Sequence, residues 1–278
     1  NEISDLGLLP ADFGCLGERV GYYGNSLGDH FGVGHIFLAG EAPGLFYGYV
    51  TQGIVQKEDI TENGIKYIKQ DGSVGYYQTV NKTTPVAGDV KYVDRNGDGV
   101  VDDNDRDIIG NPNPDFTYGF QTKVSWKSLS LSASFNGVQG RDILNVGNRY
   151  NNTPGTKSNN VTRKAFQNMW TDENPSNLYP KSTFVVQNMV MDRYVEDGSY
   201  LRCSDITLSY VLPAKWTNKI GIKNTSVYAS VKNAFVITDY SGYDPEVNSF
   251  AFDGLRPGVD MNSYPTPRSF VFGLNLTF

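Results

Sequence analysis

The sequence has few of the residues that mark disulfide-rich, metal-binding or helical membrane proteins. Its 278 residues include two cysteines and two histidines, and no apolar run approaches the roughly 18 residues of a transmembrane helix. Cys15 and Cys203 are far apart and form neither a CxxC motif nor a zinc-type spacing. They are interpreted as two unpaired small hydrophobic residues, with a disulfide between them left open. His30 and His35 lie five residues apart without a third ligand nearby.

Charged residues are also scarce, and the composition argues against nucleic-acid-binding and disordered proteins. Charged residues make up 19 % of the chain, compared with about 25 % in typical soluble domains. The 24 basic and 30 acidic residues give a net charge of −6, which argues against a nucleic-acid surface. The abundant residues are Tyr (18), Phe (15) and Gly (30), which favour strands and turns over helices. Aromatic residues at 13 % exclude intrinsic disorder.

The clearest local pattern is the alternation over the last nine residues, Phe270–Phe278. One face carries Phe270, Phe272, Leu274, Leu276 and Phe278, and the other carries Val271, Gly273, Asn275 and Thr277. A period of two, apolar against small or polar, predicts a strand with a different solvent on each face. The sequence printed here ends on the aromatic Phe278 of the apolar series.

The same alternation recurs upstream in four further segments. Tyr118–Trp126 and Leu129–Asn136 are separated only by Lys127 and Ser128, which predicts a hairpin with one apolar and one polar face. A third such strand occupies Asp205–Leu212, and a fourth, weaker one occupies Val227–Lys232. The polar face of the hairpin includes Gln121 and Lys123.

The connections between these predicted strands alternate between short and very long. Lys127-Ser128 is minimal, whereas the segments 137–197 and 238–267 are far longer than the loops of most compact domains. Outer-membrane barrels combine short periplasmic turns with long extracellular loops. The pattern therefore predicts an all-β fold, an antiparallel transmembrane β-barrel, ahead of a soluble sandwich.

One motif predicts a metal ion. Residues 94–105 match the calcium loop D-x-[DN]-x-[DN]-G-x5-E except at the last position. The predicted ligands are the side chains and one carbonyl of Asp94, Asn96, Asp98, Val100, Asp102 and Asp105. Asp105 replaces the usual glutamate and is one methylene shorter, so calcium affinity should be lower. No helix pair flanks the loop, which predicts a structural Ca²⁺ rather than a calcium sensor. The alternative interpretation is a metal-free turn rich in Asp and Asn.

Catalytic residues are not marked by the sequence. There is no GxSxG, HExxH or P-loop motif, and a carboxylate pair for glycoside hydrolysis is not identifiable. Weak candidates for stacking on a substrate are the loop aromatics Tyr150, Trp170, Tyr240 and Tyr243, with Tyr179 in the same group. Loop packing is the preferred interpretation of each. The long loop 137–197 is expected to contain a short helix within Val161–Trp170.

Several longer segments resemble the SusC/RagA-type TonB-dependent outer-membrane transporters. GEAPGLFYGYVTQGIVQ resembles their G-x-P-x-G-x-F-Y-G-Y…G-I-F-Q segment, and the stretch containing DRNGDGVVDDNDRDIIGNPNPDFTYGF resembles their G-D-x-K-x-x-D-x-N-G-D-G signature. The resemblance covers nearly all of the chain from Gly40 onward, whereas residues 1–39 match loosely. The matching segments are Gly40–Gln56, Gly88–Phe120, Met169–Lys181, Glu196–Pro213, Val227–Asn248 and the closing strand to Phe278. Cys203 replaces the aliphatic residue usual in this family.

This resemblance implies a fold and a set of partners. Such proteins are barrels of about 22 strands with an N-terminal plug, energised by TonB and capped by a SusD-like surface lipoprotein. They import oligosaccharides or peptides across the outer membrane of Gram-negative bacteria. Residues 1–278 would be the C-terminal portion of such a barrel, without the plug. At about 10 residues per strand, it would hold roughly six or seven strands. The resemblance also implies that Phe278 is a recognition signal for barrel assembly.

Two other functions remain as alternatives at this point. The first is a soluble, calcium-stabilised surface module that binds glycans, which the Asp94–Asp105 loop and the loop aromatics would allow. The second is a glycan-cleaving enzyme. The sequence begins at Asn1 without Met, and is interpreted as processed or as a piece of a longer protein. Because isolated sheet edges are not tolerated in a bilayer, it is expected to be stable only together with the remaining strands of the transporter.

Overall fold

A computed structural model describes residues 3, 13–15, 20–23, 27, 33–153, 160–182, 189–217, 222 and 224–277. Strands dominate these residues, and the helices among them are short. The described part of the chain contains no helix that is long and apolar enough to cross a membrane. The chain divides into two compact units. Unit 1 comprises residues 1–113, 142–196 and 248–262, and unit 2 comprises residues 114–141, 197–247 and 263–278.

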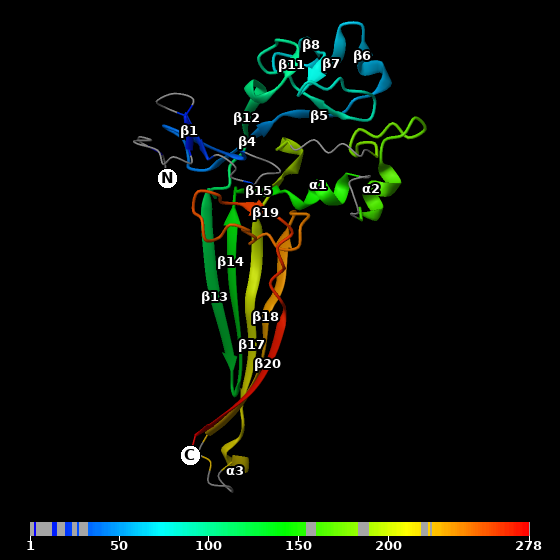
Figure 1. Cartoon of the computed structure of the whole chain (residues 1–278). Coiled ribbons are helices and arrows are strands. Elements are labelled where there is room, and N and C mark those ends of the chain that lie inside the picture. Colours follow the sequence, from blue (N-terminus) through cyan, green and yellow to red (C-terminus); the bar gives the residue numbers. More distant parts are fainter. Residues whose placement is uncertain are drawn as a thin grey trace. The chain divides into compact units, whose positions relative to one another are not determined.

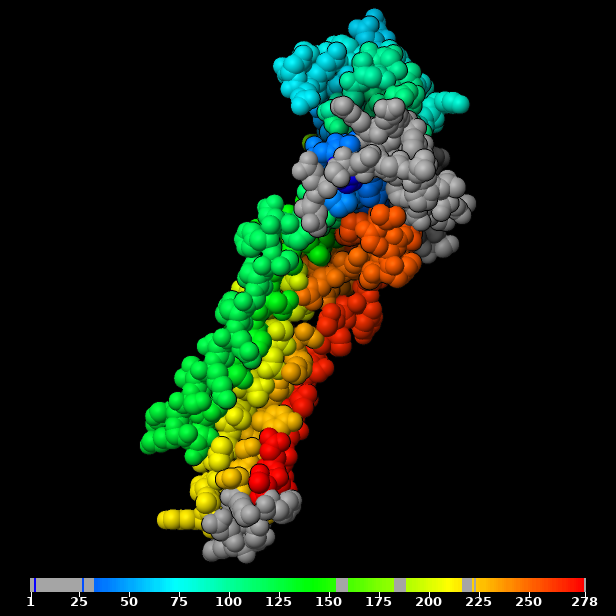
Figure 2. Space-filling view, turned by 90° about the vertical axis from the view of Figure 1, so that its left-hand side faces the viewer, coloured from blue at the N-terminus to red at the C-terminus, as the bar shows by residue number. Residues whose placement is uncertain are grey.

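Unit 2 is built on one sheet of five long strands (Figure 1). Every neighbouring pair is antiparallel, in the order β13-β14-β17-β18-β20. The predicted antiparallel all-β fold is therefore confirmed. Figure 2 shows the five strands side by side, from green through yellow and orange to red. Their bounds are β13 (Phe116–Trp126), β14 (Leu129–Gln139), β17 (Tyr200–Val211), β18 (Asn224–Thr238) and β20 (Ser269–Thr277).

The strand register gives this sheet one apolar and one polar face. A typical row on the apolar face runs across all five strands, through Val124, Leu131, Leu208, Ala229 and Phe272. The next row on the opposite face runs through Lys123, Ser132, Thr207, Ser230 and Val271. Because side chains alternate along each strand, the two predicted faces extend over the whole sheet. Apolar side chains such as Trp126 (68 % exposed) and Phe272 (79 %) stay open on this face.

An irregularity in β17 keeps the two faces separate near the loop end of the sheet. Asp205 pairs with Ser134, but Cys203 pairs with Phe135, so Ser204 is one extra residue in β17. Such a bulge reverses the alternation of the strand on one side of it. Cys203 thereby joins the apolar face, and Arg202, opposite Asn136, joins the polar face.

Unit 1 contains the hydrophobic core of buried residues. Its central members are aromatic: Phe46, Tyr49, Tyr67, Tyr77 and Tyr92 are each at most 2 % exposed. Tyrosine hydroxyls in this core are bonded; for example, Tyr67 donates to the carbonyl of Asp94 at 2.7 Å. This core fixes the position of the Asp94–Asp105 loop, because its first residue adjoins the buried tyrosines.

Short strands and helices surround this core. A five-stranded sheet has the order β1-β2-β3-β4-β12, and the small sheets are β6-β7-β8, β10-β5, β11-β9 and β16-β15-β19. The bounds are β1 (Phe13–Cys15), β2 (Val20–Tyr23), β3 (His35–Leu38), β4 (Leu45–Tyr49), β5 (Thr51–Ile54), β6 (Ile60–Thr61), β7 (Gly64–Ile68), β8 (Val74–Tyr77), β9 (Thr79–Val80), β10 (Val90–Tyr92), β11 (Val100–Val101), β12 (Arg106–Gly110), β15 (Asp142–Asn145), β16 (Val195–Asp197), β19 (Val259–Asp260), α1 (Gly147–Asn152), α2 (Arg163–Asn168) and, in unit 2, α3 (Ala214–Thr217).

Two features differ from the sequence-based expectations. The long-stranded sheet has five strands, not six or seven, because nearly all of the residues before β13 belong to unit 1. The segment 137–197, expected to be a long loop with one short helix, begins within β14 and contains β15, α1, α2 and β16. Helix α2 lies within the Val161–Trp170 segment, and the Thr162 hydroxyl caps it by accepting a hydrogen bond from the Ala165 amide at 3.1 Å.

The stability of unit 1 is expected to depend on pH through the buried residue His35. The ring is fully buried on β3, and Nε2 contacts the Pro257 carbonyl at 3.2 Å. Nδ1 has no hydrogen-bond partner among the described residues. Burial lowers the pKa of His35 to about 4, with a further lowering by Arg256 that the Pro257 hydrogen bond and the charge of Asp253 oppose.

We expect unit 1 to lose stability as the pH falls from about 6.5 towards 4, because only the unfolded chain binds the proton in that range. The loss at pH 5 should be about 2 kcal/mol, from the size of one pKa unit. Hydrogen exchange of the β3 amides, corrected for intrinsic rates, would measure it. His35→Gln retains a donor for Pro257 but does not titrate, so an equal loss in this variant would contradict the assignment.

Candidate functional site

The polar face of the five-stranded sheet carries the first candidate functional group. Asp205 on β17 binds Lys232 on β18 at 2.7 Å. The same carboxylate accepts hydrogen bonds from the hydroxyls of Thr207 at 2.8 Å and Ser230 at 2.7 Å. All four side chains project from two neighbouring strands of the polar face, where exposed Gln121 and Lys123 also lie. This face is therefore polar and carries charge of both signs.

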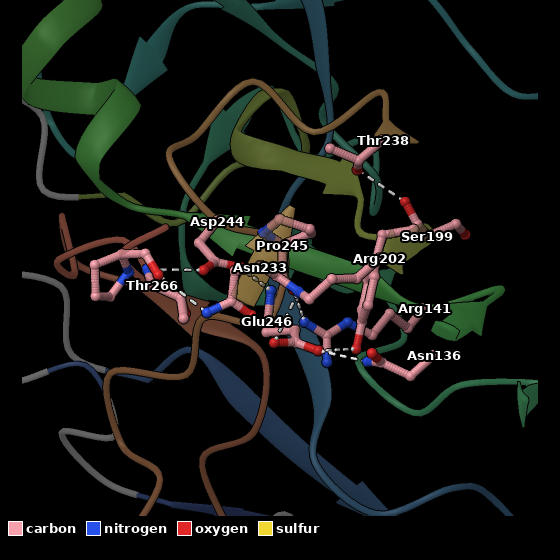
Figure 3. Close-up of polar contacts among 12 residues, drawn as sticks. Asn136, Arg141, Ser199, Arg202, Asn233, Thr238, Asp244, Pro245, Glu246 and Thr266 are labelled. Atoms are coloured by element: carbon pink, nitrogen blue, oxygen red, sulfur yellow. Dashed lines mark hydrogen bonds and ion pairs between the residues drawn. The ribbon is translucent and has the colours of Figure 1, made fainter. Parts of the chain in front are cut away.

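A second group lies at the loop end of the same sheet (Figure 3). Arg202 extends from β17 into a set of acidic and amide side chains and is 5 % exposed. Its Nη2 donates to Asp244 Oδ1 at 2.5 Å. Its Nε lies 3.1 Å from Glu246 Oε2, an ion-pair contact without the geometry of a hydrogen bond. The Glu246 carboxylate also accepts from the Tyr200 hydroxyl at 2.7 Å and from the Asn136 amide at 2.9 Å.

Asp244 connects both ends of the long β18–β20 connection to the sheet. Its Oδ1 binds Arg202 and accepts the Glu246 amide at 3.0 Å, while Oδ2 accepts the Thr266 amide at 3.0 Å. Residues 244–246 follow β18, and Thr266 lies three residues before the start of β20. We call Arg202, Asp244, Glu246 and Thr266 the loop clasp. Arg141 adds a guanidinium hydrogen bond to the Pro245 carbonyl.

The surroundings of Asp244 favour its charged form. Burial acts to raise the pKa of Asp244, but hydrogen bonds from Thr266 and Glu246 and the charge of Arg202 outweigh it, so the pKa is lowered. A lowered folded-state pKa means that this stabilisation is present above the unfolded pKa and is lost as the pH falls through the folded-state pKa. The clasp thus holds the loop ends at any pH near neutrality.

The sequence did not indicate the clasp. Its residues lie in three separate segments, and continuing the alternation of β17 upstream from Ile206 would put Arg202 on the apolar face. The only available signal was the acidic and proline-containing run DPEV after β18, which alone predicts a turn.

The predicted calcium loop adopts the sharp turn that the motif requires. Gly97 and Gly99 have φ values of 77° and 86°, which glycine adopts without a Cβ penalty. Asp94 is 3 % exposed, and its two carboxylate oxygens accept the amides of Gly97 at 2.6 Å and Gly99 at 2.8 Å. A cavity of about 310 Å³ adjoins the loop on the side of the Lys69–Asp71 turn.

The acidic side chains at the far end of the loop are also bonded to backbone. Buried Asp105 accepts the amides of Arg95 at 2.8 Å and Asp102 at 2.8 Å. Burial raises the pKa of Asp105, and the nearby charge of Asp94 adds to the rise. Within the described ranges, no three or more His, Cys, Asp or Glu side chains are grouped so as to hold a metal ion. The oxygen donors suit Ca²⁺, and those of Asp94 and Asp105 are bonded to backbone amides of the loop.

The four aromatic candidates occupy different environments. Trp170 is 9 % exposed and donates its indole N–H to Gln56 at 3.0 Å, and Tyr240 is 5 % exposed. Tyr150 packs against the core of unit 1, 5.2 Å from the Arg149 guanidinium. Tyr243 is 74 % exposed. Of the four, Tyr243 alone presents most of its ring to a ligand.

Three other sequence-based assignments can be placed only in part. Cys203 is a free, buried thiol on the apolar face of β17, whereas the side chain of Cys15 lies outside the described residues. His30 and the proposed assembly signal Phe278 also lie outside them. The role of Phe278 therefore stays a prediction.

Comparison with known proteins finds relatives of one kind, although no family model matches the sequence. A TonB-dependent receptor of Formosa agariphila is 35 % identical over 201 residues, covering 69 % of this chain and 20 % of the receptor. TonB-dependent receptor SusC of Bacteroides thetaiotaomicron is 34 % identical over 194 residues, 67 % of this chain and 17 % of SusC.

A solved structure resembles the fold as well as the sequence. The RagAB peptide importer in its open-open state aligns with a TM-score of 0.60 at 26 % identity, over 88 % of this chain and 23 % of the importer chain. The chain spans about a fifth of the length of the curated relatives it matches. These relatives are receptors and transporters, not enzymes.

Proposed function

Because this chain belongs to the SusC/RagA-type TonB-dependent transporters, we propose that it is the C-terminal wall segment of an active importer in the outer membrane of a Gram-negative bacterium. The observation that carries the proposal is the two-faced sheet of unit 2. Its apolar rows, such as Val124–Leu131–Leu208, would contact lipid. Its polar rows would line the path of the solute.

The edges of the sheet support a larger assembly. Strands β13 and β20 each pair with only one strand among the described residues. Unpaired edges are not tolerated within a bilayer, so we infer that both pair with strands of the remaining transporter. The eleven residues of β13 are long enough to span a bilayer at the tilt of a barrel strand.

We further propose that the importer is energised by TonB and works with a SusD-like surface lipoprotein. The substrate would be an oligosaccharide or a peptide; one structural neighbour is described as a peptide importer. The clasp would set the start and end of the β18–β20 connection on the extracellular side. Exposed Tyr243, one residue before Asp244, is the candidate for contact with substrate or lipoprotein.

Purification from native membranes tests this function. We expect the protein to require detergent, to elute as part of a large complex, and to carry a surface lipoprotein and the upstream barrel and plug sequence, identified by mass spectrometry. A detergent-free species of about 30.7 kDa would contradict the proposal and favour the soluble calcium-stabilised module.

We also propose that the 94–105 loop binds Ca²⁺ as a structural ion. Asp94, Asn96, Asp98, Asp102, Asp105 and the Val100 carbonyl would hold it, with the ion replacing part of the hydrogen bonding to backbone. With aspartate at the last position, the affinity should be that of weaker calcium loops, with a Kd of about 10⁻⁵–10⁻³ M.

Calcium titration of the purified transporter after chelation tests this site. Asp98→Ala is expected to remove one equivalent of Ca²⁺ binding and to abolish the thermal stabilisation of unit 1 by added Ca²⁺. Glu62→Ala, which removes an exposed carboxylate elsewhere in unit 1, is the matched control. Equal calcium stoichiometry in the wild type and Asp98→Ala would show that the loop is metal-free.

A further inference from the structure

Charge is distributed unevenly along the chain. Unit 2 contains nine basic and six acidic residues, which give it a net charge of +3. The whole chain has a net charge of −6, so the residues outside unit 2 have a net charge of −9. Five of the six acidic residues of unit 2 adjoin the loop ends of the strands: Asp115, Asp197, Asp239, Asp244 and Glu246. The sixth, Asp205, is paired with Lys232. The opposite end of the sheet is therefore free of acidic residues.

This opposite end, which we call the turn end, consists of the β13–β14 turn, the β17–β18 connection and the end of β20 (Figure 1). Its described basic residues, Lys127 and Lys215, are both exposed. The sequence adds Lys219 and Lys223 in the same connection. Lys127 and Lys215, with no acidic side chain in the sequence between residues 206 and 238 or between 116 and 141, make this a cationic rim.

Each described lysine of the rim lies next to an exposed indole. Trp126 is 68 % exposed at the end of the apolar face, and the Lys127 ammonium lies 4.8 Å from the centre of its ring. Lys127 has a φ of 52°, so the two-residue turn holds this lysine in a left-handed conformation. Trp216 is 66 % exposed and follows Lys215 in α3. Tyr210 adjoins this end of the apolar face, opposite Leu129.

We infer that the turn end binds the phosphate headgroups of anionic phospholipids in the inner leaflet of the outer membrane, an inference that rests on the proposed barrel function. Indole rings favour the boundary between acyl chains and headgroups, which sets the depth of the rim. Lysines at that depth reach the phosphates. A lipid of net negative charge is preferred over a zwitterionic one, because the sequence places no Asp or Glu between residues 206 and 238 or between 116 and 141 to bind the amine of a zwitterionic headgroup.

Native mass spectrometry of the detergent-purified transporter, mixed with equal amounts of phosphatidylglycerol and phosphatidylethanolamine, tests this inference. We expect the wild type to retain phosphatidylglycerol at least about tenfold more than phosphatidylethanolamine, since each lysine near an anionic surface contributes a factor of about five. In the double variant Lys127→Gln/Lys215→Gln, which keeps both indoles, the ratio should fall about tenfold. Raising the salt from 0.1 to 0.5 M should lower the wild-type ratio.

A matched double variant controls for general loss of charge. Lys66→Gln/Lys164→Gln removes two exposed lysines of unit 1 and should leave the ratio unchanged. Equal retention of the two lipids by the wild type, or equal falls in both double variants, would overturn the inference while leaving the import function intact. A protein that is not recovered from the outer membrane would overturn both.

Discussion

Replacing Leu208 by lysine is expected to prevent most of the transporter from assembling in the membrane. Leu208 lies in the middle of β17 on the apolar face, between Leu131 and Ala229. A lysine facing lipid near the bilayer midplane costs about 2–4 kcal/mol, which is a factor of about 30 or more in the equilibrium between assembled and unassembled protein. The amount of folded transporter in outer-membrane fractions, measured by its heat-modifiable migration on gels, gives the effect.

The adjacent residue supplies the control. Ser209 projects from the opposite face, between Ser130 and Tyr228, where a lysine would contact water and join other polar side chains. Ser209→Lys should therefore assemble at near wild-type levels. If the two variants assembled equally well, or if Ser209→Lys were the more defective, the assignment of lipid and solute faces would be wrong.

Replacing Asp244 by alanine is expected to release the β18–β20 connection from the sheet. The variant leaves the buried guanidinium of Arg202 without its closest partner, and side chains of the Arg202–Asp244 pair are only 6 % and 9 % exposed. Removing one member of a buried ion pair typically costs about 3–5 kcal/mol. The Thr266 amide also loses its acceptor. We expect faster proteolysis and faster hydrogen exchange at residues 239–247 and 263–267 of the intact transporter.

Two further variants distinguish the loss of the clasp contacts from the loss of one negative charge. Asp239 is exposed at the start of the same connection, and Asp239→Ala should behave as wild type. The double variant Arg202→Met/Asp244→Leu removes both buried charges and should be more stable than Asp244→Ala alone, because no uncompensated charge remains. Wild-type protection in Asp244→Ala would show that the loop ends are held by other contacts.

Transport should respond to the same variant if the clasp positions the loop over the solute path. Uptake through Asp244→Ala should decline even where the amount of assembled protein is unchanged, whereas Asp239→Ala should transport normally. A decline in uptake that merely followed the amount of assembled protein would indicate a role in folding alone.

The sequence by itself determined the strands and their faces. Alternation in Tyr118–Trp126, Leu129–Asn136 and the described part of the last strand, Phe270–Thr277, placed the apolar rows correctly. The reason is that the side-chain period of a strand is local and does not depend on its partners. The minimal Lys127-Ser128 connection likewise predicted the hairpin. The glycine of the calcium-loop motif, Gly99, marked the sharp turn of the acidic loop, because its positive φ is a local property of the backbone.

Tertiary structure decided which residues act together. The clasp unites Arg202, Asp244 and Thr266, which are up to 64 positions apart, and no local pattern encodes such contacts. The side of the sheet on which Arg202 lies depends on the extra residue Ser204, which reverses the alternation of β17 relative to β14. Burial of Trp170 and Tyr240, which the sequence had offered as ligand contacts, likewise follows from packing between distant segments. The alternation along a strand therefore predicts its two faces up to a bulge. The bulge, and the contacts between distant segments, decide which side chains meet.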